Sequence, residues 1–182
     1  MVGRRIQKTE DDFIREAMHE MPYGIYVIGT TRDGKPNGMI ADWVMQVSFE
    51  PRLVIAAFER DSSSLARIRD HRFYTVNLLP QQDGLLIAQR FVQPSDAAKV
   101  RGRSGAAAAQ QHDKLAGLDY RLSERAPGCP ILEDAVAYLE CAAEQFIEVG
   151  DHVVVPARVL YGEIQHSGDS LTSIETGWSY SG

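Results

Sequence analysis

The chain has 182 residues, of which 44% are hydrophobic and 24% charged, and its formal net charge at pH 7 is −6. This size and composition predict one globular domain over residues 1–182 with a sizeable core. The acidic balance, without any Lys/Arg-rich patch, argues against nucleic acid as a partner. No apolar run approaches membrane-spanning length and no signal-peptide core opens the chain, so we expect a cytoplasmic protein with no membrane partner.

The first predicted element is a helix over about residues 9–20. Thr9 followed by Asp12 is a capping pattern, and apolar residues recur at helical spacing until the chain reaches Pro22. We expect this helix to cover one end of a β-barrel.

Strands predominate in the next stretch. Their β-branched, aromatic or alternating residues predict strands over residues 23–31, 37–48, 53–58 and 73–79. The pair Asp33-Gly34 turns the first of these strands into the second and makes a hairpin. The run from Asp61 to Ser64 caps a helix that carries Leu65 and Ile68.

The second half of the chain mixes helix, loop and strand. A helix is predicted over residues 83–92, and strands over 120–122, 135–142 and 153–164. Residues 94–113 are polar, small and weakly patterned, and we interpret them as a mobile excursion or lid. The succession predicts a mainly β fold with inserted helices (α+β), arranged as an antiparallel barrel and not as a doubly wound sheet. No Gly-x-Gly-x-x-Gly or Gly-x-x-x-x-Gly-Lys motif supports a dinucleotide crossover or a P-loop.

Sulfur and imidazole groups give no sign of a metal site. We interpret Cys129 and Cys141 as buried free thiols, with a single disulfide as the alternative. The five histidines lack the spacing of metal ligands, so we predict no bound metal.

The stretch from Asn37 to Ser48, followed by Pro51, is the first candidate site. It runs as an alternating extended segment, so its backbone amides could line the edge of a planar ligand. Trp43 or Met45 would cover a ring face, and a side-chain amide would add a polar contact. The predicted binding positions are Ile40, Ala41, Asp42, Trp43 and Gln46. The alternative is an ordinary half-buried strand.

Three consecutive serines form a candidate anion site. Ser62, Ser63 and Ser64 open a helix, where unpaired amides and the positive end of the helix dipole attract negative charge. Plain helix capping is the alternative. Lys99, with Arg101, is the nearest basic candidate for neutralising the anion, and its alternative is a solvated surface charge.

The turn Gly150-Asp151-His152 is the second candidate site and places a lone histidine at the start of a late strand. Taken alone, a histidine after such a turn is more often structural than catalytic. Together with residues 37–48, in this order and spacing, it resembles the flavin reductase-like family, whose members bind FMN in a split β-barrel. Further matches are Thr75 to Leu79 and Cys129 to Ala135.

The resemblance implies an FMN-dependent oxidoreductase, with FAD as the alternative flavin and NAD(P)H as the hydride donor to flavin N5. His152 would be the catalytic residue that orients the nicotinamide, and Asn77 would lie on the strand that borders the flavin. The resemblance also implies a homodimer, in which Trp178 and Tyr180 either reach the partner or pack on their own barrel. A redox protein or a monooxygenase would take up the electrons.

Two departures from the family pattern bear on the reaction. Ile40-Ala41-Asp42-Trp43 stands where many stand-alone flavin reductases have Thr-Ala-Ser-Ser, so hydroxyl contacts to the ring are lost while backbone contacts remain. Val155-Pro156-Ala157-Arg158 replaces the usual Gly-Glu continuation, and its proline implies an edge or a bulge.

The segment from Met39 to Val47 is closer to flavoredoxin-like proteins and to flavin domains joined to rubredoxin. The alternative function is therefore a non-catalytic flavin electron carrier that a protein partner reduces. The third hypothesis is that the protein binds haem or only mediates association with other proteins.

Overall fold

The sheet is antiparallel throughout, and its order departs from the order of the chain. This computed structural model describes residues 8–92 and 113–178. Its main sheet has eight strands in the order β2-β1-β5-β8-β10-β4-β3, with β9 paired to β10. These strands are β1 (Tyr26–Arg32), β2 (Lys35–Ala41), β3 (Val44–Phe49), β4 (Arg52–Glu59), β5 (Phe73–Leu78), β8 (Ala137–Ala143), β9 (Ile147–Val149) and β10 (His152–Ile164). β6 (Tyr120–Leu122) and β7 (Pro130–Leu132) form a second, two-stranded sheet. The predicted α+β fold is confirmed.

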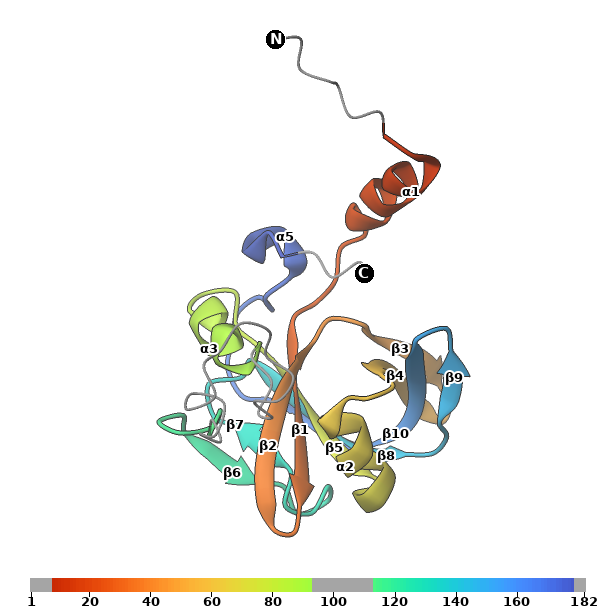
Figure 1. Cartoon of the computed structure of the whole chain (residues 1–182). Helices are drawn as coiled ribbons and strands as arrows, with labels where there is room; N and C mark the ends of the chain where they lie inside the picture. The colour runs from red at the N-terminus through yellow and green to blue at the C-terminus, as the bar shows by residue number, and fades with distance from the viewer. Residues whose placement is uncertain (1–7, 93–112, 179–182) are drawn as a thin grey trace, which may run out of the picture.

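The two ends of the sheet, β2 and β3, follow one another in the chain and are joined only by Asp42 and Trp43. β2 pairs with β1 and β3 pairs with β4, so the chain crosses between the two ends at this point. The prediction of one strand over 37–48 is therefore wrong, because the chain turns where the Val44 amide donates to the Asp42 carbonyl. Helix α2 (Ser63–His71) lies between the β1–β2 and β3–β4 hairpins (Figure 1).

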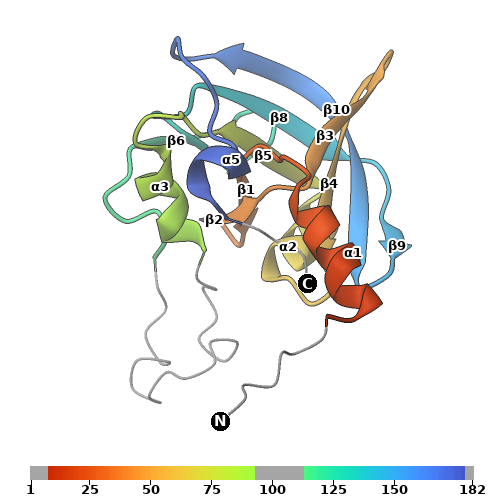
Figure 2. The same cartoon turned by 90° about the horizontal axis from the view of Figure 1, so that it is seen from above.

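Both faces of β1 are buried, which explains its nearly continuous run of buried residues. Ile28 lies in a first core together with Ile68 of α2. Val27 points to the other face and lies in a second core, to which helix α3 (Gly84–Phe91) contributes Phe91. Figure 2 shows α3 and α2 on opposite sides of the β1–β2 hairpin. The hairpin therefore separates two cores, and each core has its own helix.

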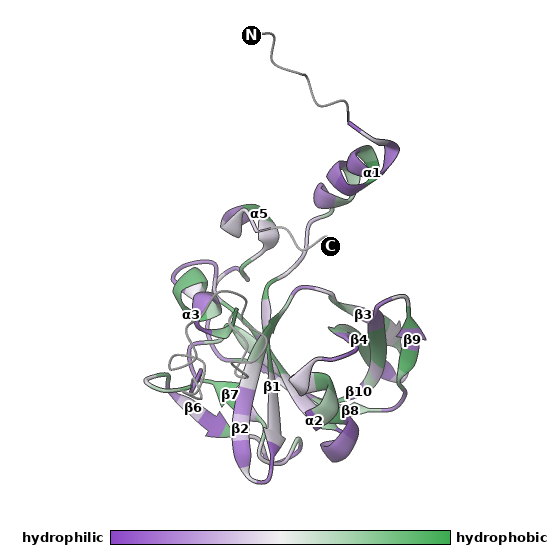
Figure 3. Cartoon of the chain, in the orientation of Figure 1, coloured by the Kyte–Doolittle hydropathy of each residue, from purple (hydrophilic) through white to green (hydrophobic). Residues whose placement is uncertain are grey.

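Helix α1 (Glu10–His19) stands apart from the barrel (Figure 1). The predicted capping box is present, since the Thr9 hydroxyl accepts from the Asp12 amide and the Asp12 carboxylate accepts from the Thr9 amide. None of its ten residues is buried, and Phe13 and Ile14 are 58% and 59% exposed. The expectation that this helix covers a barrel end is wrong for the single chain, because none of its residues belongs to either core. Figure 3 shows both hydrophilic and hydrophobic residues along this outlying helix.

Pro156 is not at a sheet edge, contrary to the prediction. It lies in β10, an interior strand, opposite Ile55 of β4. Its carbonyl accepts from the Glu144 and Gln145 amides, on the side where the β8 ladder has already ended at Ala157. The absent N–H of a proline therefore costs no ladder hydrogen bond here. The bulge in β10 lies farther on, between Val159 and Tyr161.

Several short elements had no strong signal in the sequence. Strands β7 and β9 have three residues each, and helix α5 (Ser173–Thr176) has four. Trp178, just after α5, packs against the second core of its own chain, which is the second of the two placements weighed for it. Tyr180 and nearly all of the predicted lid over 94–113 lie outside the described residues, and the division into a single domain stays a prediction.

Both cysteines are buried free thiols, as predicted. Burial raises the pKa of the Cys129 thiol to about 12 and raises that of Cys141 as well. Neither sulfur is therefore a thiolate at neutral pH.

Candidate functional site

The bend between β2 and β3 brings Trp43 to His152. Strand β4 lies between β3 and β10 in the sheet, and His152 at the start of β10 pairs with Glu59 at the end of β4. The Trp43 carbonyl accepts from the Ala57 amide of β4, which fixes the bend on the same strand. The indole and imidazole ring centroids are 4.8 Å apart and the rings are tilted by 43°. The two stretches that the sequence singled out thus meet in one place.

Asp151 orients the imidazole of His152. The Nδ1 atom of His152 lies 2.6 Å from Asp151 Oδ1, and the His152 side chain is only 12% exposed. This hydrogen bond holds the pKa of the Asp151 carboxyl below its usual value. Because a carboxylate can only accept, Nδ1–H donates to it, and this contact fixes the orientation of the ring.

Asp42 is a second acid near the same imidazole. Burial raises the pKa of the Asp42 carboxyl, while hydrogen bonds from its own amide and that of Trp43, and the charge of His152, lower it. The net direction is upward. The bend therefore places a half-buried carboxyl beside the Trp43–His152 pair, where the family pattern has a serine.

The side chains at the other predicted positions of this segment do not take part in the Trp43–His152 contact. Ala41 is buried in the first core, and Ile40 packs against the second core. Gln46 is exposed on β3, and its side-chain amide donates to the Ser48 carbonyl at 3.2 Å. These side chains are thus used by the fold or lie apart from the Trp43–His152 pair, and only the main chain of residues 40 and 41 leads into the bend.

Asn77 lies away from any surface. It is fully buried in β5, and its side-chain amide donates to the Val27 and Pro130 carbonyls at 3.1 and 3.3 Å. Its side-chain carbonyl accepts from the Leu132 amide at 2.8 Å. This side chain joins β7 to the main sheet and does not line the candidate site.

The three serines lie in three different environments. Ser62 is the N-cap of α2, but its hydroxyl makes no capping hydrogen bond and lies 3.9 Å from the sulfur of Met39 on β2. Ser63 is exposed and Ser64 is buried. The start of α2 therefore lies beside the middle of β2. Lys99 and Arg101 lie outside the described residues.

Two cations that the sequence reasoning missed flank β2. Lys114 is 5% exposed, and its Nζ atom donates to the Gly38 carbonyl at 3.3 Å and to the Phe91 carbonyl at 3.2 Å. Arg67 of α2 donates to the Lys35 carbonyl at 3.1 Å. Within residues 8–92 and 113–178, no carboxylate forms an ion pair with Lys114. No periodic pattern surrounds Lys114, so the sequence carried no signal for it.

Burial lowers the pKa of both cations, because it disfavours their charged forms. Burial, and then the charge of Arg67, lower the pKa of Lys114 to about 8. Burial and the charge of Arg32 lower the pKa of Arg67, and the charge of Asp33 partly offsets this. Lys114 is thus still protonated at neutral pH, in a place where its charge costs free energy.

Replacing Lys114 by methionine is expected to stabilise the ligand-free protein. At pH 7 the change removes a poorly compensated buried charge, and the free energy of unfolding should rise by about 1–3 kcal/mol. The folded-state pKa near 8 lies below the ordinary value of 10.5. Between those two pH values the Lys114 side chain binds more protons in the unfolded chain than in the folded protein, so the free energy of unfolding of the wild type rises with pH. The difference in stability between the wild type and the Lys114→Met variant therefore becomes smaller. Urea unfolding at pH 7 and pH 9.5 measures both effects.

The matched control for this change is Lys35→Met, which removes an exposed ammonium from the start of the same strand. It should leave stability within about 0.5 kcal/mol of wild type. A Lys114→Met variant that is less stable than wild type at pH 7 would contradict the cost assigned to the buried charge.

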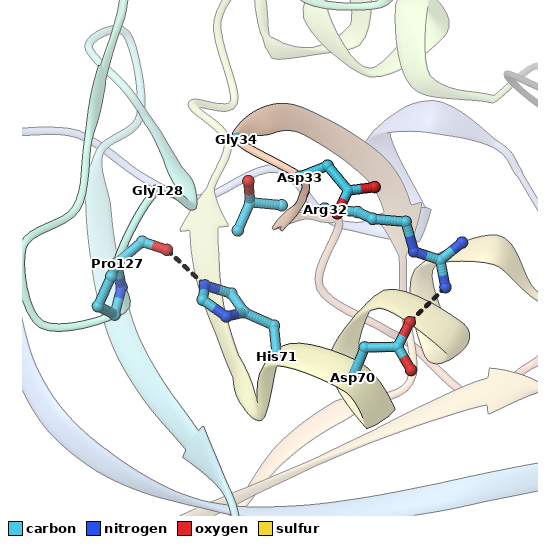
Figure 4. A pocket seen from close by; sticks show the side chains of 8 residues that line it. Arg32, Asp33, Gly34, Asp70, His71, Pro127 and Gly128 are labelled. Carbon is cyan, nitrogen blue, oxygen red and sulfur yellow. Dashed lines mark hydrogen bonds and ion pairs between the residues drawn. The ribbon is translucent and has the colours of Figure 1, made fainter.

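A hollow at the β1–β2 turn is a separate feature (Figure 4). It is lined by Arg32, Asp33, Gly34, Asp70, His71, Pro127, Gly128 and Thr31. Two polar pairs are formed within it, since Arg32 pairs with Asp70 at 2.5 Å and His71 Nε2 lies 2.6 Å from the Pro127 carbonyl oxygen. It lies at the opposite end of β2 from the bend, so it takes no part in the candidate site.

In residues 8–92 and 113–178, no three histidine, cysteine or acidic side chains gather as a group that could hold a metal ion. No helix in those ranges combines the length and the apolar character needed to span a bilayer.

Comparisons with known proteins agree with this architecture. The family model described as "Flavin reductase like domain" matches residues 18–175. The chain is 28% identical over 170 residues to a flavin reductase of Pseudomonas putida, covering 93% of this chain and 89% of that protein. It is 25% identical over 158 residues to the high molecular weight rubredoxin of Moorella thermoacetica, covering 86% of this chain. The chain spans only 62% of the length of that rubredoxin.

A solved NADH:FAD oxidoreductase of Streptomyces globisporus C-1027 has the same fold. It superposes with a TM-score of 0.73 at 22% identity, covering 94% of this chain and 89% of that structure. The predicted split-barrel fold is thereby confirmed, and the family model covers most of the chain. The chain belongs to the flavin reductase-like domain family.

Proposed function

We propose that this chain binds FMN at the split between β2 and β3 and works as an NAD(P)H-dependent flavin reductase that passes electrons onward. The observation that carries the proposal is the meeting of Trp43 and His152, 4.8 Å apart, at the bend between the two sheet ends. The family membership and the similarity to a Pseudomonas flavin reductase support the flavin.

The residues present fit a flavin. The main chain of residues 40–43 leads along the end strand into the bend and would meet the polar edge of the ring. The indole of Trp43 offers an apolar face. The start of α2 and the buried ammonium of Lys114 lie farther back along β2, where a phosphate would find donors. Apolar cover and anion donors are the two features such a ligand requires.

When bound, the flavin supplies a ring that accepts a hydride at N5 from C4 of the nicotinamide. The residues of this chain serve to position the reactants, since the hydride acceptor and donor must come within about 3–3.5 Å. Asp151 fixes the tautomer and rotation of His152 through the 2.6 Å contact. His152 in turn orients the nicotinamide, and Trp43 shields the ring from water. No proton transfer from His152 is needed for this step.

A non-catalytic electron carrier is the second candidate. The Trp43 ring lies against the His152 ring, so the indole partly covers the imidazole that would otherwise orient a nicotinamide. The similarity to a rubredoxin of high molecular weight favours electron exchange with a protein. On this reading a redox partner, and not NAD(P)H, would reduce the flavin.

The deciding experiment is an anaerobic absorbance titration of the FMN-reconstituted protein with NADH and then NADPH. Wild type should bleach the oxidised flavin band rapidly, and His152→Ala should slow the bleaching by about 10–100-fold, because the nicotinamide loses its orientation. The KM for the dinucleotide should rise while the Kd for FMN stays within about twofold. His19→Ala, on the outlying helix α1, is the control and should behave as wild type.

The outcomes separate the candidates. If FMN binds but stays oxidised with either dinucleotide, the result would favour the non-catalytic electron carrier over the reductase. A His152→Ala variant that bleaches at the wild-type rate would remove His152 from the reaction. A preparation that does not retain FMN at all would defeat both candidates.

We also propose a homodimer, a monooxygenase or redox protein as electron acceptor, and a cytoplasmic location. The dimer has support in the large apolar side chains that the single chain leaves uncovered. Phe49 on β3 is 84% exposed and Met45 is 60% exposed, in addition to the apolar side chains of α1. Exposed apolar surface on this scale is typical of an interface.

A further inference from the structure

The hollow at the β1–β2 turn is bounded by three segments that lie far apart in the chain (Figure 4). Residues 31–34 come from the end of β1 and the turn after it, residues 70–71 from the end of α2, and residues 127–128 from the loop between β6 and β7. Its volume is about 660 Å³. Sites for small molecules typically have about 300–1,000 Å³, so the hollow has the size of such a site.

Two polar contacts on opposite sides of the hollow hold its walls together (Figure 4). Nε2–H of His71 donates to the Pro127 carbonyl oxygen at 2.6 Å, because a carbonyl oxygen can only accept. This contact ties the β6–β7 loop to α2. On the other side, Arg32 Nη2 lies 2.5 Å from Asp70 Oδ2, which joins β1 to α2. The walls are therefore fixed by contacts between distant segments.

Glycines leave the space between these contacts open. Gly34 and Gly128 line the hollow, and a Cβ atom added at Gly34 would have no atom within 4 Å. Both glycines have a positive φ, +70° and +75°, which other residues rarely adopt. The backbone conformation thus favours residues without side chains at these two positions.

Thr31 lines the same hollow with an unsatisfied hydroxyl. Its side chain belongs to a residue that is only 6% exposed, and Oγ1 forms no hydrogen bond with any described residue. A buried hydroxyl without a partner costs about 1–3 kcal/mol, so such groups are rare in folded proteins. An orphaned hydroxyl beside an open hollow points to a polar ligand.

The charged groups of the hollow can still bind groups of both signs. Arg32 contacts Asp70 through one of its nitrogens, and a guanidinium has five N–H donors. The Asp33 carboxylate also lines the hollow, and within residues 8–92 and 113–178 it forms no ion pair. A simple anion would meet two carboxylates here, and a simple cation would meet the guanidinium. A ligand that carries both charges avoids either repulsion.

We propose that this hollow binds a zwitterionic α-amino acid with a large side chain. The carboxylate of the ligand would bind Arg32, and its ammonium would bind Asp33 and Asp70, so that the ligand lies head to tail with the Arg32–Asp70 pair. Hydrogen bonds between ionised groups are roughly twice as strong as those between neutral ones. The side chain of the ligand would occupy the space left open beside Gly34. This site is separate from the flavin site and does not depend on the proposed function.

The test titrates isotope-labelled protein with L-phenylalanine, phenethylamine and hydrocinnamate, and follows the backbone amides by NMR. All three probes carry the same phenyl ring, but phenethylamine lacks the carboxylate and hydrocinnamate lacks the ammonium. L-Phenylalanine should shift the amides of Gly34 and Gly128 with a Kd of about 1 mM or below. Each analogue should bind at least about 10-fold more weakly, because it loses one charge-assisted interaction.

Two variants assign the charges of the ligand to residues. Arg32→Gln and Asp33→Asn should each weaken L-phenylalanine by about 5–10-fold, since both side chains are exposed enough for solvent to screen them. Arg32→Gln should not weaken phenethylamine, and Asp33→Asn should not weaken hydrocinnamate. Arg69→Gln is the control on α2, because Arg69 pairs with Glu148 and does not line the hollow. It should bind all three probes as wild type does.

The other outcomes would overturn the inference. L-Phenylalanine that shifts no amide around the hollow would show that the hollow is not such a site. Phenethylamine or hydrocinnamate that binds as tightly as L-phenylalanine would show a site for a simple ion. Wild-type affinity in both Arg32→Gln and Asp33→Asn would place the binding elsewhere. A failure to bind FMN would contradict the proposed function and leave this inference intact.

Discussion

An Asn77→Ala variant is expected to lose about 3–4 kcal/mol of its free energy of unfolding. The fully buried side chain satisfies the Val27 and Pro130 carbonyls and the Leu132 amide. Each buried polar group that loses its partner costs about 1–3 kcal/mol, and alanine supplies no replacement. Urea denaturation monitored by circular dichroism measures the loss.

The control for this change is Gln46→Ala, which removes an amide of similar chemistry from an exposed position on β3. It should change stability by less than about 0.5 kcal/mol. If Asn77→Ala cost no more than Gln46→Ala, the hydrogen bonds from Asn77 to β7 would not hold the small sheet to the large one.

A Gly29→Ala variant is expected to cost about 2–4 kcal/mol through steric conflict. A Cβ atom at Gly29 in β1 would lie 2.3 Å from Thr75 Oγ1 and 2.5 Å from the carbonyl oxygen of Pro130. The Thr75 hydroxyl also donates to the same Pro130 carbonyl at 2.6 Å. Backbone cannot move aside as a flexible side chain does, so β7 would have to shift away from the main sheet. Thermal unfolding measures the cost.

Gly34→Ala provides the matched control. Gly34 has φ +70° at the β1–β2 turn, but no atom lies within 4 Å of an added Cβ. Its cost should therefore be the backbone strain alone, about 1 kcal/mol. Equal losses at Gly29 and Gly34 would show that crowding at Pro130 does not decide the packing of β7.

The identities of the strands and helices followed well from local sequence. The capping box at Thr9 and the Asp33-Gly34 hairpin depend on residues within a few positions of each other, and both are present. These hydrogen bonds form between residues close together in the chain, so short sequence patterns are enough to predict such elements without knowing the fold. The same locality explains why α1 was predicted as a helix while its expected place over the barrel was wrong.

The candidate site was predictable in part. Residues 40–43 and His152 were identified through a resemblance in order and spacing, and the structure places Trp43 and His152 in contact. Asn77 was also identified, yet its side chain serves the core. Alternation along β5 cannot show which polar side chain has partners in a strand 50 residues away.

The sequence by itself determined most of the helices and strands of this protein, its family and the two stretches that form the corner at Trp43 and His152. The tertiary structure alone decided where the chain breaks between β2 and β3, and that Lys114 is buried against Gly38 and Phe91. Strand pairing and burial are set by contacts between residues far apart in the chain, and no local pattern records them.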